Sequence, residues 1–203
     1  MKSLNFRSFK RSVIILVFFI WPSVSALAQN HINLTLRWNS KSGVYDVYGK
    51  PNFTAQDYPI GPTQISIVCP KIVPNKNLRT ISYQMGFSQI DSIFEPLAAP
   101  QSDFFAFQSF GAKLDFIENV EYLLFSFRFT DNICREGVRI FDNDSDPNYS
   151  MPGMSGGDFR NAIYSVMSEE LYNINYDNLG SVCDNCPKEI CIPFKLIKNT
   201  NND

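Results

Sequence analysis

Four aspartates lie in and just after one loop of the sequence, and they could bind a hard cation. Three alternate between positions 142 and 146, and the fourth stands at position 158. Ca²⁺ takes about six to eight oxygen ligands, which carboxylates at alternate loop positions can supply. The EF-hand pattern is absent, because Pro147 and Gly153 stand where that loop has its glycine and its bidentate carboxylate. We therefore expect a calcium site of another kind, with a solvated Asp/Asn turn as the alternative. Its ligands would be Asp142, Asp144, Asp146 and Asp158.

Aromatic side chains form the second candidate site. Large aromatic residues are common at interfaces, where their flat rings can stack on a sugar. A ligand-binding surface of this kind is expected from Tyr45, Tyr48, Phe104 and Phe105. The alternative is that these rings fill the core. Trp38 continues the apolar series of Ile32, Leu34 and Leu36, which favours the core for its side chain.

Five cysteines, at positions 69, 134, 183, 186 and 191, indicate disulfides in an exported protein. Five is an odd number, so at least one thiol is free or pairs between chains. We expect Cys134 to join one of the tail cysteines, Cys183, Cys186 or Cys191, and to tie the tail to the domain. Cys69 lies on the apolar face of its expected strand and is the expected free thiol. The alternative is a zinc site, which needs four ligands from the same set.

No motif in the sequence indicates catalysis. The only histidine, His31, lies close to the expected mature N-terminus, and a Ser-His-Asp or Cys-His mechanism would have to use it. The glycines at 153, 156 and 157 lack the lysine and the following helix of a phosphate-binding loop. We therefore predict that the protein is not an enzyme.

Residues 1–28 have the features of a signal peptide. Four basic residues precede an apolar run, Val13 to Trp21, and Ala26-Leu27-Ala28 is a small-x-small cleavage site. The run is much shorter than the roughly 20 residues that span a bilayer. Cleavage after Ala28 removes four basic residues and no acidic ones, which changes the formal net charge from −2 to −6. We expect a secreted or cell-surface protein with no membrane span after cleavage and no nucleic-acid partner.

The elements that position these residues are expected to be short strands. Residues 31–38 alternate between apolar and polar side chains, and residues 121–130 place Leu123, Phe125, Phe127 and Phe129 on one face. Further strands are expected at 44–48, 63–69, 79–85, 102–110, 138–141, 161–166 and 171–176. The proline-containing segments 50–62 and 86–100 are expected to be loops.

No stretch has a sustained helical period, so the pattern predicts an all-β protein. Short strands separated by Gly, Pro and Asn are typical of an antiparallel β-sandwich, either immunoglobulin-like or jelly-roll-like. We expect one sandwich domain over residues 29–180, followed by a cysteine-containing C-terminal tail over 181–203 that disulfides tie down.

Several motifs resemble those of a family of secreted modules from Bacteroidetes-type bacteria. They are Gly-Val-Tyr-Asp-Val-Tyr (43–48), Asn-Phe-Thr (52–54), Gly-Pro-Thr-Gln-Ile-Ser-Ile-Val (61–68), Leu-Leu-Phe-Ser-Phe (123–127), Cys-Arg-Glu-Gly-Val-Arg-Ile-Phe (134–141) and Pro-Gly-Met-Ser-Gly-Gly-Asp-Phe (152–159). The resemblance covers nearly all of the mature chain up to about Phe159. It implies a layout similar to cohesin-like and carbohydrate-binding sandwiches, and it brings no assigned activity.

Together these features predict a non-enzymatic exported module that acts in adhesion, assembly or display through loops at one end of the sandwich. The alternative is a carbohydrate-binding module assisted by Ca²⁺, which is the only cofactor expected. The partner would be a cell-surface protein or a glycan.

Overall fold

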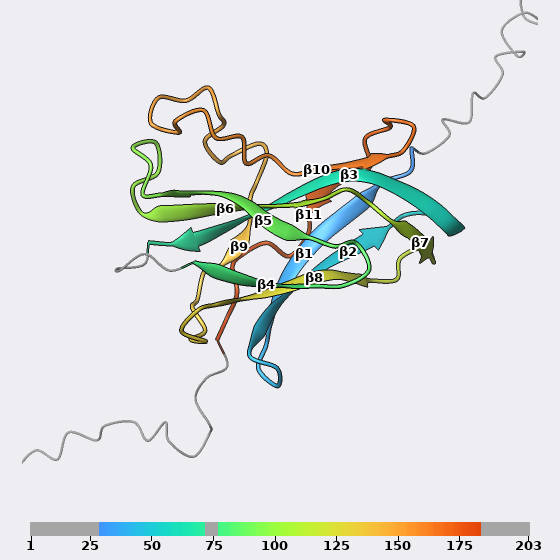
Figure 1. Ribbon diagram of the computed structural model, residues 1–203, viewed down its shortest axis with the longest axis horizontal. Helices are drawn as coiled ribbons and strands as arrows, with labels where there is room; N and C mark the ends of the chain where they lie inside the picture. Colours follow the sequence, from blue (N-terminus) through green and yellow to red (C-terminus); the bar gives the residue numbers. More distant parts are fainter. Residues whose placement is uncertain (1–28, 72–76, 184–203) are drawn as a thin grey trace, which may run out of the picture.

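The computed structural model describes residues 29–71 and 77–183, which form two packed β-sheets (Figure 1). The strands are β1 (Ile32–Asn39), β2 (Val44–Pro51), β3 (Ala55–Pro70), β4 (Leu78–Ser82), β5 (Ser88–Phe94), β6 (Ser102–Ser109), β7 (Lys113–Phe116), β8 (Tyr122–Phe129), β9 (Arg139–Ile140), β10 (Ala162–Ser165) and β11 (Tyr172–Asn175). The described residues contain no helix, which confirms the predicted all-β sandwich. Within them there is accordingly no helix of the length and apolarity needed to cross a membrane.

The first sheet has the strand order β11-β1-β2-β8-β4. Its β1–β2 hairpin is confirmed as predicted, with Gly43 at φ 66° in the turn, a conformation that glycine adopts without steric cost. β1 also pairs with β11, and this is a parallel pair between strands far apart in sequence. The ring of Trp38 packs partly buried against the core and lies 4.8 Å from that of Tyr45.

A bulge in β8 changes which leucine enters the core. The pairing with β2 shifts between Val47 and Tyr48, so that Phe125 and Leu123 oppose successive residues of β2. Leu124 is therefore 5% exposed and Leu123 is 37% exposed. The predicted position of Leu123 on the buried face is wrong, because a bulge reverses the alternation beyond it.

Two segments predicted to be loops contain strands. β3 runs through Pro59 and Pro62, and it changes partners along its length, from β7 near residues 55–59 to β6 at 63–70. The carbonyl of Pro59 still accepts a hydrogen bond from the Val166 N–H at 3.2 Å. The proline-based prediction of a loop is wrong here because strands can tolerate proline where ladder pairing changes. β5 at the sheet edge was likewise expected to be a loop.

The second sheet has the order β10-β3-β6-β5, with β7 and β9 also pairing with β3. Its inner face packs on the first sheet, where the rings of Phe107 and Phe125 lie 4.9 Å apart. Its outer face is covered in part by the long loop that follows β9 (orange in Figure 1). That loop places Phe141, Met154 and Phe159 against outward-facing residues of β3 and β6. β6 is therefore buried on both faces over residues 103–107, whereas Gln108 is exposed.

A disulfide ties the end of the described chain to the domain. Cys134 is bonded to Cys183, across a sequence separation of 49 residues, which confirms that Cys134 joins a tail cysteine. Cys69 is buried and free, as predicted. Burial raises the pKa of its thiol well above the usual value, so it is held as an unreactive thiol. The predicted signal peptide at 1–28 and the cysteines Cys186 and Cys191 lie outside the described residues.

Candidate functional site

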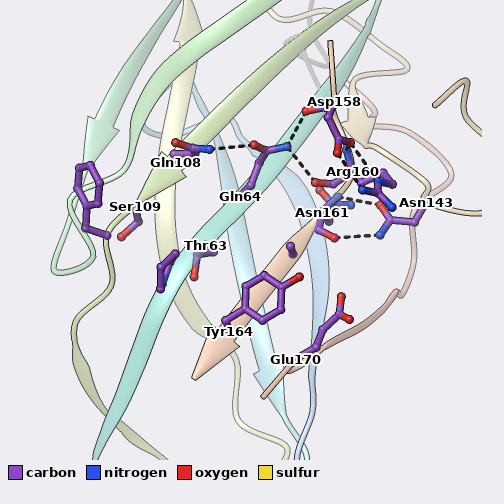
Figure 2. Close-up of a pocket in the computed structure, with 13 residues that line it drawn as sticks. Thr63, Gln64, Gln108, Ser109, Asn143, Asp158, Arg160, Asn161, Tyr164 and Glu170 are labelled. Carbon is purple, nitrogen blue, oxygen red and sulfur yellow. Dashed lines mark hydrogen bonds and ion pairs between the residues drawn. The ribbon is translucent and has the colours of Figure 1, made fainter. Parts of the chain in front are cut away.

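A groove of about 430 Å³ lies on the part of the second sheet that the long loop leaves uncovered. Its floor comes from β3 and β6, and the loop segment 158–161, β10 and the turn after β10 lie beyond β3, on the side away from β6 (Figure 2). The loop covers the apolar end of the same face, where Val68 pairs with Phe104. On this face the next residue pair along the ladder is Ser66 and Ala106, and the pair after it is polar, Gln64 and Gln108. The groove therefore begins where the outer face becomes polar.

The floor of the groove is an ordered amide pair. Gln64 and Gln108 are directly opposite in the β3–β6 ladder, and Gln108 Nε2 donates to Gln64 Oε1 at 3.1 Å. Gln64 Nε2 donates in turn to the carbonyls of Asp158 and Arg160, at 2.8 and 3.0 Å. Each amide carries two N–H donors and an oxygen with two lone pairs, so this network leaves capacity for a ligand. The internal bonds fix the amide orientations before any ligand arrives.

Asn161 anchors the loop side of the groove. Its side chain is buried, accepts from the Ser66 N–H at 2.9 Å and donates to the Phe141 carbonyl at 2.5 Å. Its backbone N–H donates to Asn143 Oδ1 at 2.8 Å, and Asn143 Nδ2 returns a bond of 2.9 Å to the Asn161 carbonyl. These bonds connect the loop to β3, so Asn143 has a fixed place at the rim (Figure 2).

An exposed ion pair stands above the floor. Arg160 donates to Asp158 through Nε at 3.1 Å and Nη2 at 2.9 Å. The Arg160 guanidinium holds the pKa of the Asp158 carboxyl below its usual value. The guanidinium also lies 5.5 Å from the centre of the Tyr149 ring. Both charges reach solvent and can bond to a polar ligand.

Two aromatic rings flank the polar floor. Phe110 follows β6 and is 97% exposed, and Tyr164 of β10 is 36% exposed. Gly111 fixes the turn behind Phe110: it has φ 99°, and a Cβ there would lie 2.1 Å from the Ile60 carbonyl oxygen. Only glycine fits such a position. Tyr164 forms an antiparallel bridge with Glu170, so their side chains share one face, as Figure 2 shows.

Three of the four aspartates predicted to bind calcium, Asp142, Asp146 and Asp158, have carboxylates held by different partners. The Asp146 carboxylate accepts hydrogen bonds from both Nη atoms of Arg139, each at 2.6 Å. The Asp142 carboxylate accepts a hydrogen bond from the Asp144 N–H at 3.0 Å. Asp158 is paired with Arg160. Among the residues that the structure describes, no three His, Cys, Asp or Glu side chains lie close enough to hold a metal ion. A site with all four ligands would have to break the Arg139–Asp146 pair, and calcium binding stays a prediction. The Asp144 N–H bond to Asp142 is of the kind expected for a self-bonded turn.

The predicted stacking surface is not formed. Tyr45, Phe104 and Phe105 are buried, with at most 1% of each side chain exposed. Tyr45 and Phe105 face the main core, and Phe104 lies under the long loop. Tyr48 is partly buried, and its hydroxyl donates to Asp46 at 3.3 Å. These rings are therefore structural, and the exposed aromatics of the groove, Phe110 and Tyr164, were not among the predicted residues.

Comparison of the chain with protein-family models, with curated proteins and with solved structures found no match. The resemblance to secreted Bacteroidetes-type modules therefore stays a prediction. What the groove can do is decided by its own geometry: it offers fixed amides, an exposed ion pair and two accessible rings on a rigid sheet.

Proposed function

We propose that the protein is an exported, non-enzymatic binding module whose groove on β10, β3 and β6 holds a glycan. The observation that carries this proposal is the combination of an ordered amide floor, Gln64 and Gln108, with the exposed rings of Phe110 and Tyr164. A sugar has the matching surface, because its hydroxyls bond to amides and its C–H face packs on an aromatic ring.

The exposure of Phe110 supports a binding role for that ring. A phenylalanine that is 97% exposed gains almost nothing from folding, because its apolar surface stays in water. Gly111 nevertheless fixes the backbone turn that places this residue at a polar groove. A ligand that covers the ring would recover the free energy of burial that folding leaves unused.

The site suits a module that presents a ligand or attaches to one. The groove is open and lies on a sheet, and its polar groups are bonded to one another before a ligand arrives. This preorganisation lowers the entropy that binding must offset. Adhesion, assembly or display at a cell surface are the settings in which we place it, with a glycan as the partner.

The test is a glycan array with the mature protein, followed by calorimetry with each glycan that binds. Phe110→Ala and Tyr164→Ala should each weaken binding by about tenfold or more, as truncation of an aromatic anchor does. Both side chains are accessible, so the unfolding midpoint should change little. The matched control is Ile117→Ala, an exposed apolar residue that does not line the groove.

Two results would overturn the proposal. The first is an array on which no glycan class is bound above background. The second is glycan binding with the same Kd in the Phe110→Ala, Tyr164→Ala and control variants, which would place the binding site elsewhere on the protein.

A further inference from the structure

A second depression, of about 580 Å³, adjoins the groove around the edge of the sandwich. It is lined by the start of the long loop, by β11 and by the segment that follows β11. Asn143 and Glu170 line both the groove and this second depression. The two hollows therefore meet at these residues and form one path from the outer face of the second sheet to the edge of the first.

The junction between the two hollows is rigid. Asn143 is fixed by its two bonds to Asn161. Glu170 stands in the connection between β10 and β11, and two backbone hydrogen bonds close this connection. The Ser165 N–H donates to the Glu169 carbonyl at 2.8 Å, and the Leu171 N–H donates to the Ile163 carbonyl at 2.7 Å. A ligand that crosses from one hollow to the other would pass over these two side chains.

The second depression is also built from fixed amides. Asn175 Nδ2 donates to the Phe141 carbonyl at 2.6 Å, and Asn178 Nδ2 donates to the Ile140 carbonyl at 2.9 Å. Asn173 Nδ2 donates to Asn33 Oδ1 at 3.0 Å. The polar character of the first groove therefore continues into the second, which is what a chain of several sugar units needs.

Charge distinguishes the two hollows. In the described chain, the charged residues that line the second depression are Asp142, Asp144 and Glu170, and no lysine or arginine lines it. The Asp144 N–H bond lowers the pKa of the Asp142 carboxyl below its usual value, so Asp142 is ionised at neutral pH. In the first groove, Arg160 offsets Asp158, and the remaining carboxylate, Glu170, stands at the junction that both hollows share. The negative potential of the path is therefore concentrated at its β11 end.

We propose that the two hollows form one extended site for a glycan chain that carries protonated amino groups, with the amino sugars lying over the β11 end. This inference rests on the proposed glycan-binding function and adds the class of glycan. A uronic acid or sulfated chain would meet carboxylates of the same sign at this end. A neutral chain would bind without the contribution of charge.

The experiment compares three oligosaccharides of equal length with the mature protein at low salt. The first is a glucosamine hexamer, the second its fully N-acetylated form, and the third a galacturonate hexamer. At pH 6 the glucosamine hexamer should bind about tenfold or more tightly than the N-acetylated hexamer, since each exposed ion pair contributes about fivefold. The galacturonate hexamer should bind most weakly. Added salt should lower the ratio of the affinity for the glucosamine hexamer to that for the N-acetylated hexamer, because salt screens exposed charges.

The variant Asp144→Asn/Glu170→Gln separates charge from shape. It should bring the affinity for the glucosamine hexamer to within about twofold of the affinity for the N-acetylated hexamer. Glu118→Gln, an exposed carboxylate outside both hollows, is the control and should leave the preference intact.

The outcomes distinguish this inference from the function on which it rests. Equal affinity for the charged and neutral hexamers, with both weakened by Phe110→Ala, would overturn the amino-sugar assignment and leave glycan binding standing. A preference that survives in the Asp144→Asn/Glu170→Gln variant would overturn the β11 end as its origin. Absence of binding to any hexamer and to any array glycan would overturn both proposals.

Discussion

Removal of the Cys134–Cys183 disulfide should lower the free energy of unfolding by about 4 kcal/mol. The bond closes a loop between cysteines 49 positions apart. In the chain-entropy model, closure of a loop of this length removes roughly 14 cal/mol/K from the unfolded ensemble, which is about 4 kcal/mol at 25 °C. A domain is typically stable by only about 5–15 kcal/mol, so this one bond supplies a large fraction of the total.

The location of the bond in the fold supports a loss of that size. The segment before Cys183 is held to the strand region near Val138 by only a few backbone bonds, among them the Gly137 N–H to Ser181 carbonyl bond at 2.9 Å. The hydroxyl of Tyr45 also donates to the Arg135 carbonyl at 2.8 Å, next to the disulfide. Without the bond, nothing keeps the two ends of segment 134–183, which contains the groove walls, close together in the unfolded chain.

The assay is urea denaturation of the mature protein and of the Cys134→Ser/Cys183→Ser variant, followed by fluorescence. The wild type measured in reducing agent is the matched control, because it has lost the same bond and keeps the native side chains. Both samples should lose about 4 kcal/mol, which corresponds to a fall of roughly 8–16 °C in Tm for a domain of this size. A loss below about 1 kcal/mol in both samples would show that the disulfide does not constrain the unfolded chain as the loop length implies.

Three further predictions address the groove and the first sheet. Asn161→Ala should lower the free energy of unfolding by about 1–3 kcal/mol in urea denaturation, because it leaves the buried Ser66 N–H without its partner, whereas the Phe141 carbonyl keeps its bond from Asn175; an unchanged stability would contradict that assignment. Gly111→Ala should lower the free energy of unfolding by about 1–3 kcal/mol, through backbone strain and the close contact with the Ile60 carbonyl. The control Gly86→Ala is also at positive φ but in open space, so it should be destabilised by backbone strain alone; equal losses in the two variants would contradict the role of the contact. The bidentate bond from Arg37 lowers the pKa of Glu121 to about 2, so the stability that this pair contributes is fully present above the usual pKa of glutamate and is lost as pH falls through about 2. The difference in unfolding free energy between wild type and Glu121→Gln should therefore shrink from pH 6 to pH 2, and a difference that stays constant over that range would refute the linkage.

Local periodicity predicted the strands well where one face of a strand is apolar. The alternation of Ile32, Leu34 and Leu36 placed β1 and its buried face correctly, because side chains on a strand alternate strictly between two faces. It failed at Leu123, where a bulge inserts a residue, and at β5, whose mixed exposure gives no clear period. Bulges depend on the partner strand and leave no regular signal in the sequence.

The groove could not be predicted, because its residues come from segments far apart in the chain. Alternation in β3 places Gln64 on the outward face of the strand, because Ile65 and Ile67 lie on the inward face. It does not say that Gln108 lies across from Gln64 or that Asn161 joins the loop to β3. These neighbours depend on strand pairing and loop packing over more than 40 residues.

The sequence by itself determined that the described chain is all-β and, away from the bulge in β8, which strand faces are apolar. It favoured a bond from Cys134 to a tail cysteine and a free Cys69 without fixing the connectivity, and the structure confirmed both expectations. These properties follow from local patterns and from the count of cysteines. Only the tertiary structure decided that Phe104 is covered while Phe110 is exposed, although both belong to the same phenylalanine-rich segment. The physical reason is that a sequence pattern indicates which way a side chain points, whereas its burial depends on the distant segment that packs over it.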